Sequence, residues 1–156
     1  MTTPDPASVV ADADVLAADL LVGGDARDAL DVVRSHSWME LVASDPLLDD
    51  AEALIASLAD ADLAADWRER IEAERRSVAH PEGDHPALAT ALHGDAAHLL
   101  SFDADLTSAA AGVGLQGHVS VSVRTPEAFL AVFDAKSLYE SLDERSYPGP
   151  DRDPRA

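Results

Sequence analysis

The stretch SVVADAD, residues 8–14, decides the fold class. It opens with a short, partly β-branched apolar run, which predicts a buried strand, and Asp12 and Asp14 follow directly after that run. The stretch AHLLSFDAD, residues 97–105, repeats this arrangement, with Asp103 and Asp105 after the apolar residues. Two further strands are expected at residues 39–43 and 119–123.

Helical patterns lie between and after these strands. They are expected over residues 15–22, 61–77, 86–92, 126–133 and 137–142. Two further helices are expected after Asp25, as a capping residue, to about His36, and from about Pro46 to Leu58. Strands that alternate with helices predict a three-layer α/β/α domain around a central, mainly parallel sheet of four to five strands. Such sheets place their ligands beyond the carboxyl ends of the strands, so Asp12 and Asp103 are expected at the same edge.

The chain has 156 residues, which suits one domain with one core. Residues 1–7 are expected to form a flexible leader, residues 8–143 the folded domain, and residues 144–156, which are rich in proline and charge, a disordered tail. Much of the apolar content is alanine, which favours helices and buries little area, so we expect a thin core.

The composition is strongly acidic, with a net charge of −19 and Lys136 as the single lysine. The acids are spread along the chain, which resembles the composition of haloarchaeal cytoplasmic proteins, where salt screens the repulsion between surface charges. The other interpretation is that the acids bind basic partners or metal ions.

Without cysteine there are no disulfides or thiolate metal sites. No membrane span or signal peptide is evident, so a soluble cytoplasmic protein is expected.

Carboxylates gathered at one sheet edge favour magnesium or manganese chemistry. These hard cations prefer oxygen ligands, and they relieve the repulsion among neighbouring acids. Asp50 is a third candidate, because it lies at the edge of the apolar face of the helix that follows Pro46 and is expected to point into a cleft beside the core. The ordinary alternatives are that Asp12 caps a helix, Asp103 belongs to a turn and Asp50 lies on a solvated face.

Four stretches resemble, in order, the motifs of PIN-domain nucleases, and the resemblance covers about residues 8–133. The stretches are VVADADVL (9–16), SDPLLDD (44–50), DHPALATAL (84–92) and HLLSFDADL (98–106). The resemblance implies that Asp12, Asp50, Asp84 and Asp103 are the catalytic acids around Mg²⁺ or Mn²⁺, that Asp105 assists at the metal, and that Ser101 and Asp14 support the site. Asp50 stands where that family usually has glutamate, Asp14 where asparagine is common, and Phe102 where glycine is usual.

The resemblance implies a metal-dependent endoribonuclease that hydrolyses RNA phosphodiester bonds. Because many members of that family are toxins, it also points to an antitoxin protein as a partner and to a homodimer. One alternative is a PIN-like binding or scaffold protein with weak or no activity. Another is a haloacid-dehalogenase-like phosphatase with Asp12 as nucleophile, but Lys136 lies after all four acids rather than before the last one, where that family needs its lysine.

Overall fold

The computed structural model describes residues 4–81, 85–104, 106, 121–143 and 145–154. Its centre is a five-stranded sheet in the order β3-β2-β1-β4-β5, and every neighbouring pair of strands is parallel. The strands are β1 (Asp5–Ala11), β2 (Glu40–Ala43), β3 (Arg75–Ser77), β4 (Ala96–Leu100) and β5 (Ser122–Arg124).

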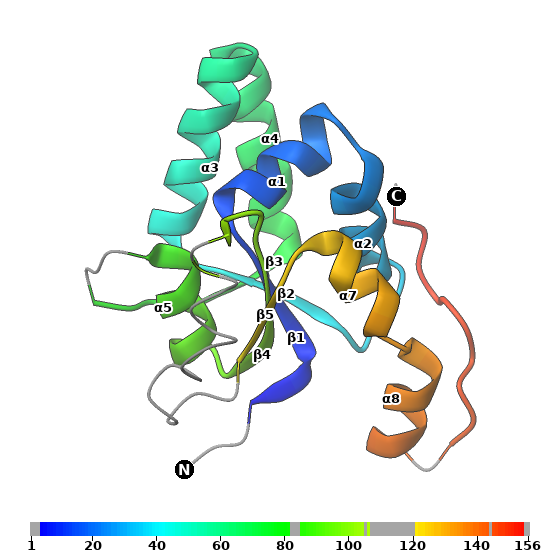
Figure 1. The fold of residues 1–156 in the computed structure, drawn as a ribbon. Helices are drawn as coiled ribbons and strands as arrows, with labels where there is room; N and C mark the ends of the chain where they lie inside the picture. The colour runs from blue at the N-terminus through cyan, green and yellow to red at the C-terminus, as the bar shows by residue number, and fades with distance from the viewer. Residues whose placement is uncertain (1–3, 82–84, 105, 107–120, 144, 155–156) are drawn as a thin grey trace.

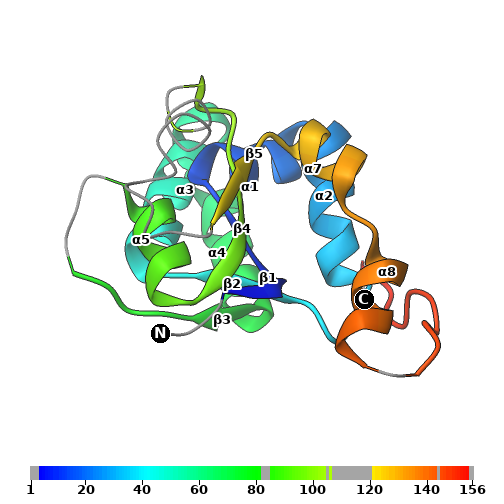
Figure 2. The same cartoon turned by 60° about the horizontal axis from the view of Figure 1, so that its bottom comes forward.

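Helices cover both faces of the sheet, which confirms the expected three-layer α/β/α fold. Figure 2 shows α5 on one face and α2 with α7 on the other, while Figure 1 shows α3 and α4 as an antiparallel pair beside the sheet. The described helices are α1 (Ala13–Leu21), α2 (Gly24–Arg34), α3 (Asp45–Leu58), α4 (Ala61–Glu74), α5 (Pro86–His93), α7 (Pro126–Val132) and α8 (Ala135–Leu142). None of these helices has the length and apolar content that a membrane crossing requires.

The helix starts follow from local chemistry. The side chain of Ser44 accepts a hydrogen bond from the Leu47 N–H, and Thr125 does the same for the Ala128 N–H, so each residue satisfies a backbone donor at a helix start. The expectation that Asp25 caps the second helix is wrong. That helix begins at Gly24, two residues before the start that a cap at Asp25 implies, and it follows Gly23, whose φ of 86° favours glycine.

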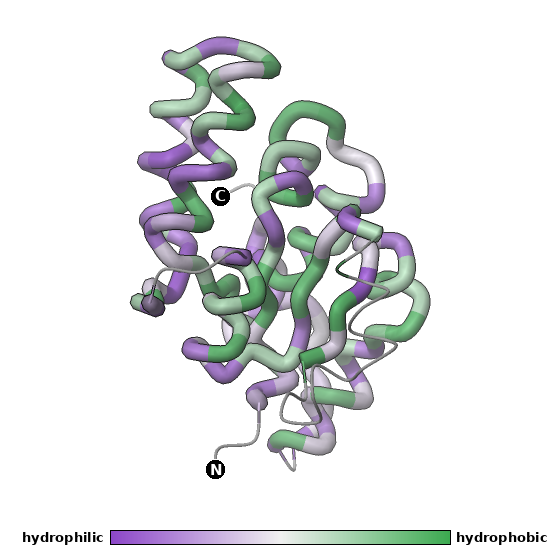
Figure 3. The backbone as a smooth tube through the Cα atoms, turned by 60° about the vertical axis from the view of Figure 1, so that its left-hand side comes forward, coloured by the Kyte–Doolittle hydropathy of each residue, from purple (hydrophilic) through white to green (hydrophobic). Residues whose placement is uncertain are grey.

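Figure 3 shows that hydrophobic segments run through the middle of the molecule. The central strands supply fully buried residues such as Val9, Val10, Leu99 and Leu100, and α7 contributes Phe129. Many of the remaining buried positions are alanine, in line with the thin core expected from composition.

The helix expected over residues 61–77 ends earlier than the sequence suggests, because Arg75–Ser77 forms the edge strand β3. Arg75 lies opposite Leu41 in parallel pairing. Its guanidinium donates to the Ala43 carbonyl at 3.0 Å and to Asp45 Oδ1 at 2.6 Å. Charged residues suit an edge strand, whose outer side needs no apolar neighbour, and this is why the apolar pattern gave no sign of it.

Both expected domain boundaries differ in the structure. At the amino end, residues 5–7 of the expected leader belong to β1, and the Asp5 N–H donates to the Asp95 carbonyl at 2.6 Å. At the carboxyl end, the segment 145–154 returns to α2 (Figure 1). The Asp151 N–H donates to the Ser35 carbonyl at 2.9 Å, and the Ser37 N–H donates to Asp151 Oδ1 at 2.7 Å. The expected disordered tail is therefore fastened to the domain.

Tyr147 anchors this segment through His36. His36 is buried, and its Nδ1 donates to the Val32 carbonyl at 2.6 Å, so its Nε2 is the acceptor for the Tyr147 hydroxyl. We expect Tyr147→Phe to lower the free energy of unfolding by about 1–3 kcal/mol, because it leaves a buried acceptor without its donor. Chemical denaturation measures the change. An unchanged midpoint would show that this hydrogen bond does not hold the segment.

Candidate functional site

The expected meeting of Asp12 and the β4 end takes place at the carboxyl edge of the sheet. β1 and β4 are neighbours, with Ala11 opposite Leu100, and the Asp12 N–H donates to the Leu100 carbonyl at 2.8 Å. The chain leaves β1 toward β2 on one side and leaves β4 toward β5 on the other, so this is the point where the strand order reverses. Open parallel sheets bind their ligands at such points.

Ser101 joins the two ends. Its side chain is buried, its hydroxyl donates to Asp12 Oδ2 at 2.9 Å, and its oxygen accepts the Asp103 N–H at 3.0 Å. Asp12 Oδ1 accepts the Ala13 N–H at 2.8 Å, so Asp12 also caps α1. The cap and the site role proposed for Asp12 are therefore compatible, because each uses a different lone pair of the same carboxylate.

Asp14 completes what we call the acid cluster: Asp12, Asp14 and Asp103, held by Ser101. Asp14 Oδ2 accepts the Phe102 N–H at 3.2 Å, whereas its Oδ1 is buried and has no hydrogen-bond partner. Burial, followed by the negative charge of Asp12, raises the pKa of Asp14 to about 6, and Asp103 adds to the same effect. The carboxylates of Asp12 and Asp103 thus disfavour a negative charge on Asp14.

The remaining predicted acids do not join the acid cluster among the described residues. Asp50 is exposed on α3, whose buried face is formed by Leu47, Leu48 and Ala51. Its neighbour Asp49 is engaged elsewhere, in an ion pair with Arg68 at 2.8 Å. Asp84 and Asp105 lie outside the described residues.

The donor set of the acid cluster fits a hard divalent cation. It offers carboxylate oxygens, and the orphaned Asp14 Oδ1 is a buried acceptor that a cation or a proton would satisfy. Within the described ranges, however, no three acid or histidine side chains converge as a complete metal-binding group. Mg²⁺ is often held by one or two carboxylates with waters completing its shell, and Asp12 and Asp103 could supply that number.

A serine–histidine pair lies at the neighbouring strand end. His80 Nε2 is 2.9 Å from Ser44 Oγ, and Thr90 Oγ1 is 2.8 Å from the same oxygen. Such a pair would suit nucleophilic catalysis if the serine were accessible. Ser44 is fully buried and caps α3, so we interpret this group as structural.

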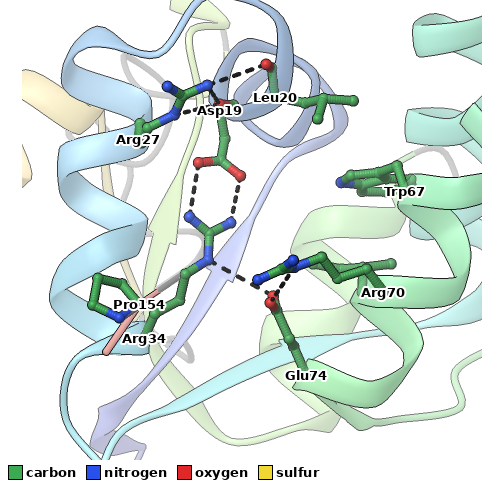
Figure 4. A pocket seen from close by; sticks show the side chains of 9 residues that line it. Asp19, Leu20, Arg27, Arg34, Trp67, Arg70, Glu74 and Pro154 are labelled. Carbon is green, nitrogen blue, oxygen red and sulfur yellow. Dashed lines mark hydrogen bonds and ion pairs between the residues drawn. The ribbon is translucent and has the colours of Figure 1, made fainter. Parts of the chain in front are cut away.

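A cavity of about 330 Å³ between α1, α2 and α4 contains a cluster that the sequence pattern did not indicate (Figure 4). Arg34 Nη1 donates to Asp19 Oδ1 at 2.8 Å, its Nη2 pairs with Asp19 Oδ2, and its Nε lies 3.7 Å from Glu74 Oε2. Arg27 donates to the Asp19 and Leu20 carbonyls at the end of α1. The one sequence signal was Asp19 itself, an acid inside an apolar helical run. Because the guanidiniums of Arg27 and Arg34 bond to carboxylates or carbonyls of the chain itself, the cluster ties three helices together.

The chain matches a family of unknown function, DUF7384, over residues 3–155. It belongs to this family. No curated protein and no solved structure matches the chain. The DUF7384 match includes the segment 145–154, which agrees with the contacts that hold this segment against α2.

The raised pKa of Asp14 predicts a pH-dependent effect on stability. Because the folded-state pKa lies above the ordinary 3.8, protonation of Asp14 favours the folded state below pH 3.8, and this contribution is lost as pH rises through about 6. We expect Asp14→Asn to raise the melting temperature at pH 7.5 in EDTA, with a gain that shrinks toward pH 4. Asparagine keeps an oxygen for the Phe102 N–H.

Thermal unfolding across this pH range measures the effect, and Asp25→Asn, at an exposed position on α2, is the matched control. A pH-independent difference between Asp14→Asn and the wild type would contradict the electrostatic explanation.

The Arg34–Asp19 pair predicts a strongly non-additive double-mutant cycle. The two side chains are only 14% and 7% exposed, so Arg34→Met strands a buried carboxylate and should cost about 3–5 kcal/mol of unfolding free energy. The double variant Asp19→Leu/Arg34→Met should recover most of that loss. Guanidinium denaturation of the four proteins tests this, and additive losses would refute it.

Proposed function

We propose that this chain is a Mg²⁺- or Mn²⁺-dependent endoribonuclease whose metal site is built on the acid cluster. The observation that carries the proposal is the convergence of Asp12, Asp14 and Ser101 at the reversal point of a parallel sheet, with a buried Asp14 oxygen left without a partner. Acids separated by some 90 positions in sequence gather there, and their mutual repulsion is what a divalent cation relieves.

Each residue has a definable task in this proposal. Asp12 and Asp103 would hold the cation through their carboxylates, with Asp14 as the nearest further acid. Ser101 fixes the carboxylate of Asp12 by donating to its Oδ2, which leaves the orientation of that ligand little freedom. A bound divalent cation would lower the pKa of a water molecule and stabilise the charge that develops on a phosphodiester.

Phosphodiester chemistry agrees with the groups that Ser101, Asp12 and Asp14 bring together. Their hydrogen bonds described above involve carboxylates, a hydroxyl and backbone N–H groups, and metal-assisted hydrolysis requires no histidine, lysine or cysteine as nucleophile. The choice of RNA over DNA rests on the resemblance to PIN-domain nucleases, as do Asp84 as a fourth acid, an antitoxin partner and a homodimer.

A second candidate is a binding or scaffold protein with little or no activity. The observation that favours it is the exposed position of Asp50, which leaves the second motif of the resemblance without a contact to the acid cluster. Catalysis measured on the purified protein separates the two candidates.

We expect Asp12→Asn to reduce Mn²⁺-dependent RNA cleavage by at least about 100-fold, because it removes a charged metal ligand while keeping an acceptor for the Ala13 N–H. Cleavage of a labelled RNA is measured in about 1 M KCl, together with Mn²⁺ binding by calorimetry. Circular dichroism confirms that the variant is folded.

Asp25→Asn, at an exposed position on α2, is the matched control and should cleave like the wild type. A wild-type protein that binds no Mn²⁺ and cleaves no RNA would refute the nuclease proposal. Binding of RNA without cleavage would favour the scaffold.

A further inference from the structure

Phe102 stands apart from the other aromatic side chains. The chain has only two tryptophans, two tyrosines and three phenylalanines, and all seven are described. Six of them are buried or in contact with another ring: Trp67 and Phe129 in the core, Phe133 stacked on Phe129, and Trp38, Tyr139 and Tyr147 in one cluster. Phe102 is 47% exposed, the only aromatic among the large exposed hydrophobic residues of the described chain.

Phe102 also lies inside the acid cluster in sequence and in space. It stands between Ser101 and Asp103, and its own N–H donates to Asp14 Oδ2 at 3.2 Å. The next N–H, that of Asp103, donates to Ser101 Oγ at 3.0 Å. These two successive hydrogen bonds fix the backbone of Phe102 and Asp103 next to Asp14 and Ser101. The exposed ring of Phe102 therefore starts from a fixed backbone position beside the acids.

Folding gives little reason for an exposed ring here. A chain with so few aromatics gains most by burying them or packing them against each other, as it does with the other six. An aromatic face beside a phosphate-binding site is, by contrast, a common element of single-strand recognition, because every nucleobase has a face on which such a ring can stack.

We propose that Phe102 stacks on a nucleobase of a single-stranded nucleic acid whose phosphate lies at the acid cluster. This proposal rests on the proposed function and names the form of its substrate. Bases in a duplex are already stacked on each other, so the ring selects single strands or loops. Stacking also does not depend on charge. This matters for a protein with a net charge of −19, because the attraction between ring and base is not weakened by electrostatic repulsion or by salt.

The first test measures binding of a cleavage-resistant, fluorescent 2′-O-methyl single strand in Mn²⁺ by anisotropy, at about 0.1 M and about 1 M KCl. We expect Phe102→Ala to weaken binding roughly tenfold at both salt concentrations, and Phe102→Trp to bind within about twofold of the wild type. Val132→Ala, which trims a still more exposed apolar residue on α7, is the matched control and should have no effect. The wild type should bind the matching duplex more weakly than the single strand.

The second test replaces single bases of the strand by abasic sites. In the wild type, one position should lose about as much affinity as Phe102→Ala does, and in Phe102→Ala the same abasic site should cost nothing further, because ring and base form one contact. Additive losses would overturn the stacking proposal.

The outcomes separate this proposal from the one on which it rests. A wild type that cleaves RNA, with Phe102→Ala unchanged in affinity and in KM, would overturn the stacking role and leave the nuclease intact; Phe102 would then be a candidate contact for a protein partner. A wild type that neither binds nor cleaves single strands would refute both proposals, starting with the nuclease.

Discussion

The hydrogen bond from the Asp12 N–H to the Leu100 carbonyl determines the candidate site. It extends the β1–β4 pairing by one residue beyond the last strand positions, Ala11 and Leu100. Because both strands run in the same direction, the residues that follow them must emerge at the same edge. Ser101 is thereby brought within hydrogen-bond distance of Asp12, and Asp103 and Phe102 take their places from Ser101 and Asp14. A one-residue change of register would turn these side chains to the other face of the sheet.

Several of the few basic side chains in this domain form ion pairs with its own acids. Arg68 pairs with Asp49, Glu52 and Glu72, and Arg34 with Asp19, so several guanidiniums are bound within the domain by its own acids. The hydrogen bonds to the Asp12 and Asp14 carboxylates come instead from the Ser101 hydroxyl and from backbone N–H groups. A carboxyl group whose pKa is shifted by burial and by a neighbouring acid, as at Asp14, is the kind of group that gathers at functional sites, and this supports the proposal for the acid cluster.

The sequence predicted what depends on local patterns. Apolar runs that end in aspartate located β1 and β4, and the parallel arrangement placed Asp12 beside the end of β4. The edge strand β3 was missed because the residues Arg75–Ser77 carry no apolar signal. The role of the C-terminal segment was missed because its contacts join Ser37 to Asp151, 114 positions away, and no local pattern encodes such a pairing. The hydrogen bond between Asp14 and the Phe102 N–H could not be predicted from the sequence for the same reason, because it depends on backbone groups that the whole sheet positions.

An acidic protein that acts on a polyanion needs attraction that does not come from its own net charge. Direct contacts between basic side chains and phosphates would be opposed by the surrounding acids and weakened by salt. A divalent cation held by carboxylates converts the acids into the means of binding, because they attract the ion that in turn attracts the phosphate. An exposed aromatic ring supplies the other part, since its contact with a base carries no charge. In the proposed site, Ser101, which contacts Asp12, is followed directly by Phe102 and Asp103, and the same strand pairing fixes the positions of all three.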